Sequence, residues 1–266
     1  MSETTSAPAN ERSPVHKALR LLARIARSDA PLALPELSRA LGLPKPTTFR
    51  LARLLEQVGY VSQDPLTRRY TLGPGFDELA LNALRNGPAQ HRRQELMNRL
   101  AVRLGVRVNL VLLKSGKVSF VEWVNSSSPL RIDLQPGVPV PVHCSASGKL
   151  LMAFAPDAVR ARFLADAPFP PQTSATLCTR AALQREFEKI RRQGYAEDCE
   201  EFMAGVNCLS VPIRNPAHQV VAGLAVMAPQ ATFPIKRCRE QRAAIQACAD
   251  AIAAEMADFA SNGRRR

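Results

Sequence analysis

Apolar residues near the start of the chain recur at helical spacing in three short, successive segments. The first, residues 13–29, opens with Ser13 and Pro14, a pair typical of a helix start, and its apolar face is predicted to hold Val15, Leu19, Leu22 and Ala26. The second, residues 34–43, places Leu34, Leu37 and Leu41 on one face and stops at Gly42. The third, residues 45–60, is predicted to bury Phe49, Ala52, Leu55 and Val58. Two short helices joined by a tight turn that contains glycine are typical of a helix-turn-helix.

Two short strands are predicted directly after the third helix. Residues 60–63 and 69–72 flank a turn at Asp64 and Pro65, so they form a hairpin in the position of a wing. The third helix and the tip of the hairpin carry the side chains that can donate to base edges or phosphates. These candidate DNA-binding residues are Lys45, Thr47, Thr48, Arg50, Arg53, Arg68 and Arg69.

The rest of the chain mixes helical and strand patterns. Residues 74–86 predict a helix that ends before Gly87 and Pro88, and we expect a linker helix over 74–87. Beyond it, helices are predicted over 91–105, 180–193 and 235–259, and strands over 106–113, 117–124 and 219–228. The predicted fold class is therefore α+β: a disordered tail over 1–12, a winged helix over 13–73, the linker helix, and one α/β domain over 88–262.

Charge is concentrated in the predicted winged helix. The 266 residues carry a formal net charge of +13. Between Arg12 and Tyr70, eleven Lys or Arg residues face four acids, so about half of the excess lies in less than a quarter of the chain. This segment is the candidate contact for a polyanion such as nucleic acid. The chain has no apolar run of membrane-spanning length and no secretory signal, and its six cysteines lack metal-ligand spacing, so we expect a cytoplasmic protein with buried thiols.

Residues 143–149, HCSASGK, look like an enzyme motif but match none. A phosphate-binding loop would need Gly at position 143 and Ser or Thr after Lys149, and an acyl-transfer motif would need Ser at position 146. We therefore expect no catalytic residue, cofactor or metal, and His143 is expected to pack in the interior. What remains is a turn of small residues before an apolar helix, which is either a carboxylate site or a plain helix cap.

Three stretches of sequence, in order, resemble the IclR family of bacterial transcription regulators. They are the winged-helix segments at 18–27, 34–61 and 70–73 (YTLG), then VPVHCSASGKLLMAF at 140–154, and GYAEDCEEFMAGVNCLSVPI at 194–213. The resemblance implies a winged helix, a linker helix and a GAF-like effector domain, with dimers or tetramers bound to operator DNA and a small metabolite as effector. It also implies that the effector pocket includes Ser145, Ala146, Ser147, Gly148, Asp198, Val206, Cys208, Ala225 and Met227.

Two of these positions depart from the pattern of the family's founding member. Ala225 and Met227 stand where that protein has small hydroxyl side chains, which favours a bulkier, more apolar effector such as an aromatic acid. Two other interpretations remain open: an α/β enzyme with an incidental basic segment, and a DNA-binding module whose second domain only dimerises. The tail Arg264–Arg266 has no assigned role, although it could contact phosphate.

Overall fold

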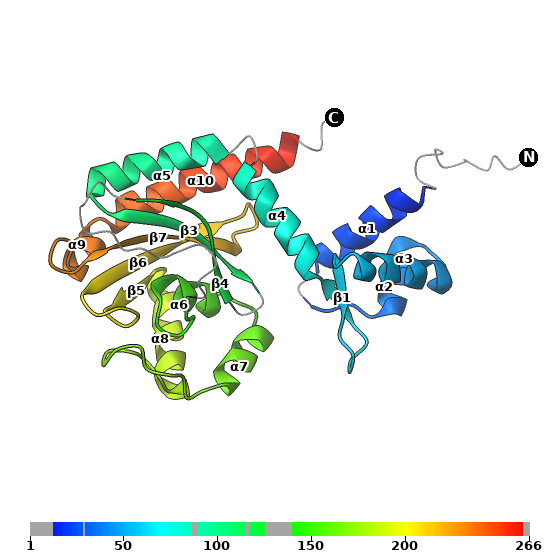
Figure 1. Ribbon diagram of the computed structural model, residues 1–266, viewed down its shortest axis with the longest axis horizontal. Coiled ribbons are helices and arrows are strands. Elements are labelled where there is room, and N and C mark those ends of the chain that lie inside the picture. Colours follow the sequence, from blue (N-terminus) through cyan, green and yellow to red (C-terminus); the bar gives the residue numbers. More distant parts are fainter. Residues whose placement is uncertain (1–12, 29, 87–89, 115–116, 126–139, 263–266) are drawn as a thin grey trace, which may run out of the picture. The chain divides into compact units, whose positions relative to one another are not determined.

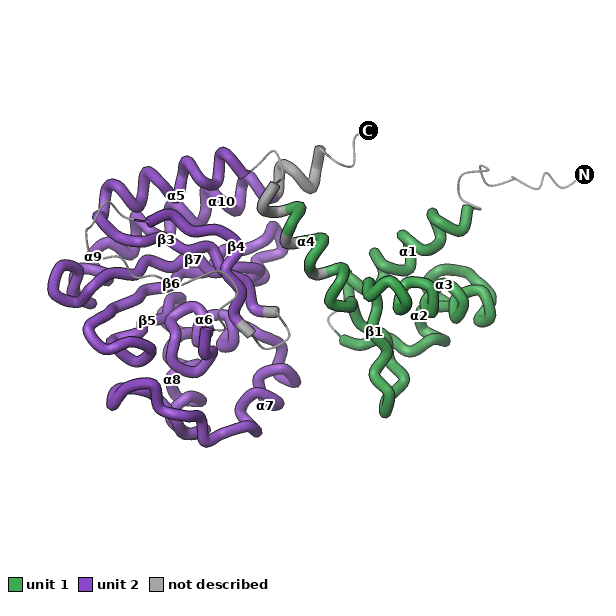
Figure 2. Tube along the Cα trace, viewed as in Figure 1, with its two compact units in different colours: residues 1–83 green, residues 84–266 purple. Residues whose placement is uncertain are grey.

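The computed structural model describes residues 13–28, 30–86, 90–114, 117–125 and 140–262. The chain divides into two compact units, residues 1–83 and 84–266 (Figures 1 and 2). The division falls inside helix α4, Pro74–Asn86, the segment expected to be a linker. The expected N-terminal tail and the C-terminal arginines lie outside the described residues.

The first unit contains three helices followed by a hairpin. Helices α1 (Pro14–Ala26), α2 (Leu34–Leu41) and α3 (Lys45–Gln57) precede the antiparallel strands β1 (Val61–Gln63) and β2 (Tyr70–Leu72). The Ser13 hydroxyl accepts a hydrogen bond from the His16 amide and caps α1. Gly42 ends α2 with a positive φ of 65°, which glycine adopts without a steric penalty. These elements confirm the winged helix-turn-helix predicted from the sequence.

The buried faces of two helices differ from the prediction. In α1 the core residues are Leu21, Leu22 and Ile25, whereas Val15 and Leu19 are 68% and 60% exposed. In α3, Leu51, Ala52 and Leu55 are buried while Phe49 and Val58 are exposed. Both helices carry aliphatic residues on more than one face, so periodicity alone does not identify the face that packs. Leu37 and Leu41 of α2 are buried as predicted.

The second unit is built on one antiparallel five-stranded sheet. Its strands are β3 (Arg107–Lys114), β4 (Lys117–Val124), β5 (Ala196–Cys199), β6 (Val206–Arg214) and β7 (Val220–Pro229), in the spatial order β4-β3-β7-β6-β5. The predictions for β3, β4 and β7 are confirmed. The pattern of apolar residues did not predict β5 or β6.

Helices cover both faces of this sheet (Figure 1). Helices α5 (Gln90–Leu104) and α10 (Arg242–Asn262) lie on one face. Helices α6 (Ala146–Ala153) and α8 (Arg180–Gln193) lie on the other, with α7 (Asp157–Ala165) packed on α8. The single helix predicted over 235–259 is two helices, α9 (Ile235–Glu240) and α10, divided at Gln241.

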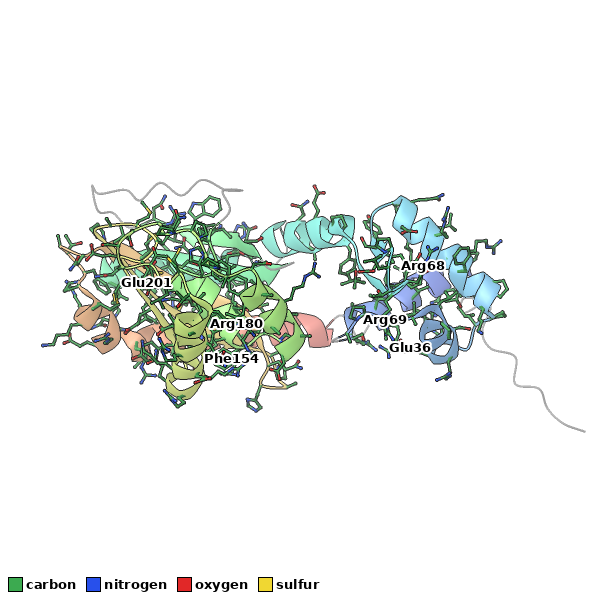
Figure 3. All side chains as sticks on the ribbon, turned by 90° about the horizontal axis from the view of Figure 1, so that it is seen from below. Glu36, Arg68, Arg69, Phe154, Arg180 and Glu201 are labelled. Carbon is green, nitrogen blue, oxygen red and sulfur yellow. The ribbon has the colours of Figure 1, made fainter. Side chains whose placement is uncertain are left out.

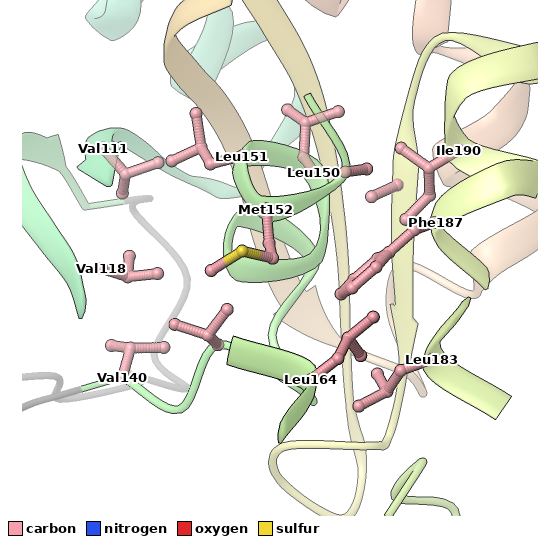
Figure 4. Close-up of a cluster of buried hydrophobic side chains, with 13 residues drawn as sticks. Val111, Val118, Val140, Leu150, Leu151, Met152, Leu164, Leu183, Phe187 and Ile190 are labelled. Atoms are coloured by element: carbon pink, nitrogen blue, oxygen red, sulfur yellow. The ribbon is translucent and has the colours of Figure 1, made fainter. Parts of the chain in front are cut away.

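Aliphatic side chains fill the space between α6, α8 and the sheet. Leu150 and Met152 of α6 belong to the same buried cluster as Val111 of β3 and Phe187 and Ile190 of α8 (Figure 4). Because successive strand residues point to opposite faces, Val206, Cys208 and Ser210 of β6 share the α6 side. This packing fixes the first turn of α6 directly above the middle of the sheet.

Candidate functional site

The exposed face of α3 is basic from Lys45 to Arg53. Lys45, Arg50 and Arg53 are exposed and Thr47 is half-buried, so these four side chains can approach a ligand from solvent. Thr48 is fully buried, and its hydroxyl donates to the Pro44 carbonyl at 3.1 Å. The prediction that Thr48 contacts DNA is therefore wrong, because position 48 lies on the same helical face as Ala52 and Leu55 and packs into the core.

Of the two arginines at the hairpin tip, one points into solvent and the other bonds to residues of the same unit. The Asp64 carboxylate accepts hydrogen bonds from the amides of Leu66 and Thr67, which orders the turn. Arg68 is exposed at this tip. Arg69 instead donates to the Pro31 carbonyl at 2.8 Å and pairs with Glu36 at 3.4 Å (Figure 3). The structure thus separates Arg68, which faces solvent, from Arg69, which fastens the hairpin to the segment between α1 and α2.

A second candidate site lies on the sheet of the second unit, beneath α6. Strand register aligns Arg107, Met227, Cys208 and Asp198 in one row across β3, β7, β6 and β5. The neighbouring row contains Asn109, Ala225 and Ser210. Both rows point toward α6, so residues that are more than a hundred positions apart in sequence form a continuous floor.

A cavity of about 20 Å³ lies between this floor and α6. Its polar lining consists of Asn109, Ser145, Ser147 and Asp198, and its apolar lining of Val118, Phe120, Val140, Phe202, Cys208, Ala225 and Met227. Ala146 and Val206 pack in the same cluster as Cys208, Ala225 and Met227. This volume suits one water molecule, so an organic ligand would require movement of flexible lining side chains such as Met227.

The first turn of α6 forms the roof of the cavity. The Ser145 hydroxyl accepts from the Gly148 amide at 3.1 Å and donates to the Pro141 carbonyl at 2.8 Å. A Cβ atom at position 148 would lie 2.5 Å from the Val142 carbonyl oxygen, so this close approach requires glycine. The amides of Ala146 and Ser147 are at the first helical positions, where the helix itself provides no acceptor. With the helix dipole, they make this turn favourable for an anion.

A buried ionic cluster lies beside the cavity. Lys149 is fully buried, its ammonium pairs with Glu201, and it lies 3.9 Å from Glu186 of α8. The Asp198 carboxylate accepts hydrogen bonds from the amides of Glu201 at 2.8 Å and Phe202 at 3.2 Å. Burial raises the pKa of Asp198 to about 7, against the opposing effect of the Lys149 charge. A substantial fraction of Asp198 is therefore protonated at neutral pH and can donate a hydrogen bond.

The cysteine and histidine near the pocket are interior residues. Burial raises the pKa of Cys208 well above its ordinary value, which keeps it a thiol. His143 contacts the Pro170 carbonyl at 3.0 Å and stacks on Phe169, as expected of a packed histidine, and burial lowers its pKa. Within the described residues, no group of three His, Cys, Asp or Glu side chains is placed to hold a metal ion. None of the described helices is long and apolar enough to cross a bilayer.

Two polar residues of the floor were missed by the sequence analysis. Asn109 lines the cavity, and Arg107 donates from Nε to Asn109 Oδ1 at 2.9 Å. Both side chains are almost completely buried. The signal available in the sequence was this pair of polar residues, two positions apart, in a run at 106–113 otherwise made of Val and Leu.

Comparisons with known proteins match both units to one family. The IclR helix-turn-helix domain model matches residues 14–65, and the bacterial transcriptional regulator IclR C-terminal model matches residues 82–254. The probable transcriptional regulator SauR of Cupriavidus necator is 33% identical over 81% of this chain and 85% of its own length. The HTH-type transcriptional regulator KdgR of Escherichia coli is 27% identical over 85% of this chain and 86% of its own.

A solved structure shares the fold across nearly the whole chain. An IclR homologue from Microbacterium hydrocarbonoxydans, complexed with 4-hydroxybenzoate, is 24% identical, with a TM-score of 0.57 over 91% of this chain and 98% of its own. The relatives that match in sequence are regulators of transcription. Together with the two family models, which cover most of the described residues, these matches show that the chain belongs to the IclR family of DNA-binding transcription regulators.

Proposed function

We propose that this IclR-family regulator reads a pseudo-palindromic operator with α3 and the hairpin tip, and that an aromatic or other organic acid bound under α6 controls its DNA binding. The observation that carries the effector proposal is the pocket itself. Backbone donors at the start of α6 face an apolar floor of Cys208, Ala225 and Met227. Such a lining suits a ligand with an anionic group on an apolar body.

The proposed DNA contacts are Lys45, Thr47, Arg50, Arg53 and Arg68. Lys45, Thr47 and Arg50 lie in the N-terminal half of α3, the part of a recognition helix that enters the major groove, and Arg53 follows less than one turn later. Arg68 is placed for phosphate contact at the hairpin tip, whereas Arg69 acts through its bonds to Pro31 and Glu36.

We further propose a cytoplasmic homodimer or homotetramer. Two-fold symmetry of the protein matches a pseudo-palindromic operator. Val15 and Leu19, exposed four residues apart on α1, offer an apolar strip for such self-association. Catalysis is not part of the proposal, because the motifs tested in the sequence fail and the ionisable groups of the pocket already bond to the protein's own backbone and side chains.

Replacement of Arg50 by Ala should weaken binding to a selected operator by about 1–3 kcal/mol and relax base preference, if Arg50 donates to a base edge. Arg68→Ala should instead reduce affinity similarly for operator and random duplex, with a shallower salt dependence. The operator is first obtained by selection from a random duplex library. Gel-shift titrations over a range of salt concentrations then measure both effects.

Two threonines provide a matched control for this experiment. Thr47→Val should reduce operator preference, whereas Thr48→Val should leave it unchanged, because the Thr48 hydroxyl bonds to Pro44 inside the unit. Equal affinity of the wild-type protein for operator and random duplex at physiological salt would contradict sequence-specific recognition.

Two substitutions in the pocket should weaken ligand binding for different reasons. We use 4-hydroxybenzoate and benzoate as first probes, each paired with its primary amide. Met227→Ser replaces an apolar wall by a small hydroxyl and should weaken binding of these aromatic probes, whereas Ala146→Val should block the roof, because Ala146 is fully buried. Calorimetry measures each affinity. If neither variant changes the affinity of a confirmed effector by even twofold, the pocket is elsewhere.

The same samples test the enzyme alternative. Mass analysis after prolonged incubation should recover each probe unchanged, and the bound probe should alter DNA affinity. Multiple turnovers per protomer would favour an enzyme, while a bound probe without any effect on DNA affinity would favour a purely dimerising second domain.

A further inference from the structure

We propose that Asn109 and Arg107 of β3 are the anion-selecting element of the effector pocket: the Asn109 amide group donates to the ligand's carboxylate, and Arg107 holds that amide in the donating orientation. This inference rests on the proposed function and adds to it the residues that distinguish an acid from its neutral amide.

The first argument is the hydrogen bonding of Asn109. Its side chain is 1% exposed and lines the cavity, and its Oδ1 atom accepts from Arg107 Nε at 2.9 Å. The other end of the amide, Nδ2, has two N–H donors, and no described residue accepts a hydrogen bond from it. An amide donor of a residue that lines the cavity, with no acceptor among the described residues, can gain a hydrogen bond from a bound acceptor.

The second argument is the position of Asn109 relative to α6. Asn109 pairs with Ala225 of β7, which pairs with Ser210 of β6. The Ser210 hydroxyl lies 3.3 Å from the hydroxyl of Ser147 in the first turn of α6. Asn109, Ser145 and Ser147 all line the same small cavity. The Nδ2 group of Asn109 and the first amides of α6 can therefore approach one ligand group from two sides.

The third argument is charge. Arg107 is 5% exposed, and its guanidinium lies 5.9 Å from the centre of the Trp123 ring. Its charged Nε–H group donates to Asn109 Oδ1 where both side chains are almost completely buried, and such a charge-assisted hydrogen bond is stronger there than in water. Arg107 thereby polarises the Asn109 amide and fixes which end of it faces the cavity, so we class it as a positioning residue.

Asp198 is the opposing charge, and it lies at the other end of the floor. Three strand spacings separate β3 from β5, roughly 14 Å. Asp198 already accepts two backbone hydrogen bonds, and its protonated form donates rather than repels. A ligand with an acid group near Asn109 and a hydroxyl near Asp198 would satisfy both ends of the pocket.

The test is the ratio of acid affinity to amide affinity for each probe pair. The wild-type protein is expected to bind each acid at least tenfold more tightly than its amide. Asn109→Asp keeps the bond to Arg107 but replaces the donor by a carboxylate oxygen, so the acid should lose at least tenfold while the amide is retained. Asn109→Leu should reduce the ratio without reversing it, and Arg107→Lys should lower it by a smaller factor than Asn109→Asp.

The control is Asn207→Leu, since Asn207 is equally buried in the same sheet but its amide points away from α6 toward the Phe233 carbonyl. Calorimetry at about pH 6, where the acids are ionised and Asp198 is mostly protonated, measures all the ratios. The Asn207 variant should keep the wild-type ratio. If Asn207→Leu and Asn109→Leu both lost the acid preference, the role assigned to Asn109 would be overturned. The loss would then follow from a general loosening of the sheet.

The remaining outcomes separate this inference from the function on which it rests. If wild-type protein prefers acids and the Asn109 and Arg107 variants keep the ratio within twofold, the anion is selected elsewhere and the inference alone fails. If wild-type protein binds none of the acids and amides at millimolar concentration, the proposed ligand class fails and the inference with it.

Discussion

Replacement of Lys149 by Met is expected to lower the free energy of unfolding by about 3–5 kcal/mol. The ammonium group of Lys149 is fully buried and compensates the carboxylate of Glu201, with Glu186 at 3.9 Å. Glu201 Oε2 already makes no hydrogen bond within the described structure, so this carboxylate depends on Lys149. Urea denaturation near neutral pH measures the loss.

A matched control uses the same partner at the surface. Lys189 also pairs with Glu186, at 3.2 Å, but its side chain is half exposed, so Lys189→Met should cost less than about 1 kcal/mol. The double variant Lys149→Met, Glu201→Leu should recover much of the loss, because it removes the unpaired buried charge as well. A Lys149→Met protein as stable as the Lys189 variant would show that this ion pair does not hold α6 to the segment after β5.

The second large effect is a dependence of stability on pH that Asp198 introduces. The pKa of its carboxyl is about 7 in the folded protein and close to 3.8 when the chain is unfolded. The folded state therefore binds more protons between these values, and the stabilisation is complete below about pH 4 and lost as pH rises through about 7. Relative to Asp198→Asn, wild-type protein should lose on the order of 4 kcal/mol between those limits.

Urea denaturation of both proteins at a series of pH values measures this difference. Subtracting the Asp198→Asn curve removes the titration of most other groups, although Lys149 and Glu201 interact with Asp198 and contribute to the size of the effect. Asp166→Asn, at an exposed position, is the control for the effect of an Asp-to-Asn substitution as such. Parallel curves for wild type and Asp198→Asn would mean that the folded-state pKa of Asp198 is not raised.

In the first unit, the sequence predicted the helices and strands better than it predicted which face of each helix is buried. Ser13, the prolines in the first turns of α1, α2 and α3, and the turn glycines mark where these helices begin and end, and these signals are local. Burial is decided by the partner that a face meets. Val15 and Leu19 extend an apolar pattern on α1, yet α2 and α3 pack against the face of Leu21 and Ile25. Thr48 was misassigned for the same reason, because a polar residue type was taken as evidence of exposure.

The family resemblance led to two of the segments that line the cavity but not to the β3 residues, and the difference has a physical explanation. The resemblance identified segments around Ser145 and Asp198, which the structure brings to one cavity with Met227. Asn109 lines that cavity, with Arg107 bonded to it, only because β3 pairs with β7, more than a hundred residues later in the chain. Strand pairing over such a distance is set by the tertiary fold, so local pattern does not reveal it.

Alternation along the strands of the second unit separates ligand recognition from structural support. On β6 and β7, Cys208 and Met227 face the pocket, whereas the neighbouring Leu209 and Val226 are fully buried on the opposite face, which α5 and α10 cover. Under the proposed function, every second residue of these strands can therefore change with the effector while the residues between them keep their contacts with α5 and α10. The same scaffold can in this way acquire a new chemical specificity through a few substitutions on one face of the sheet, while the other face stays packed on its helices.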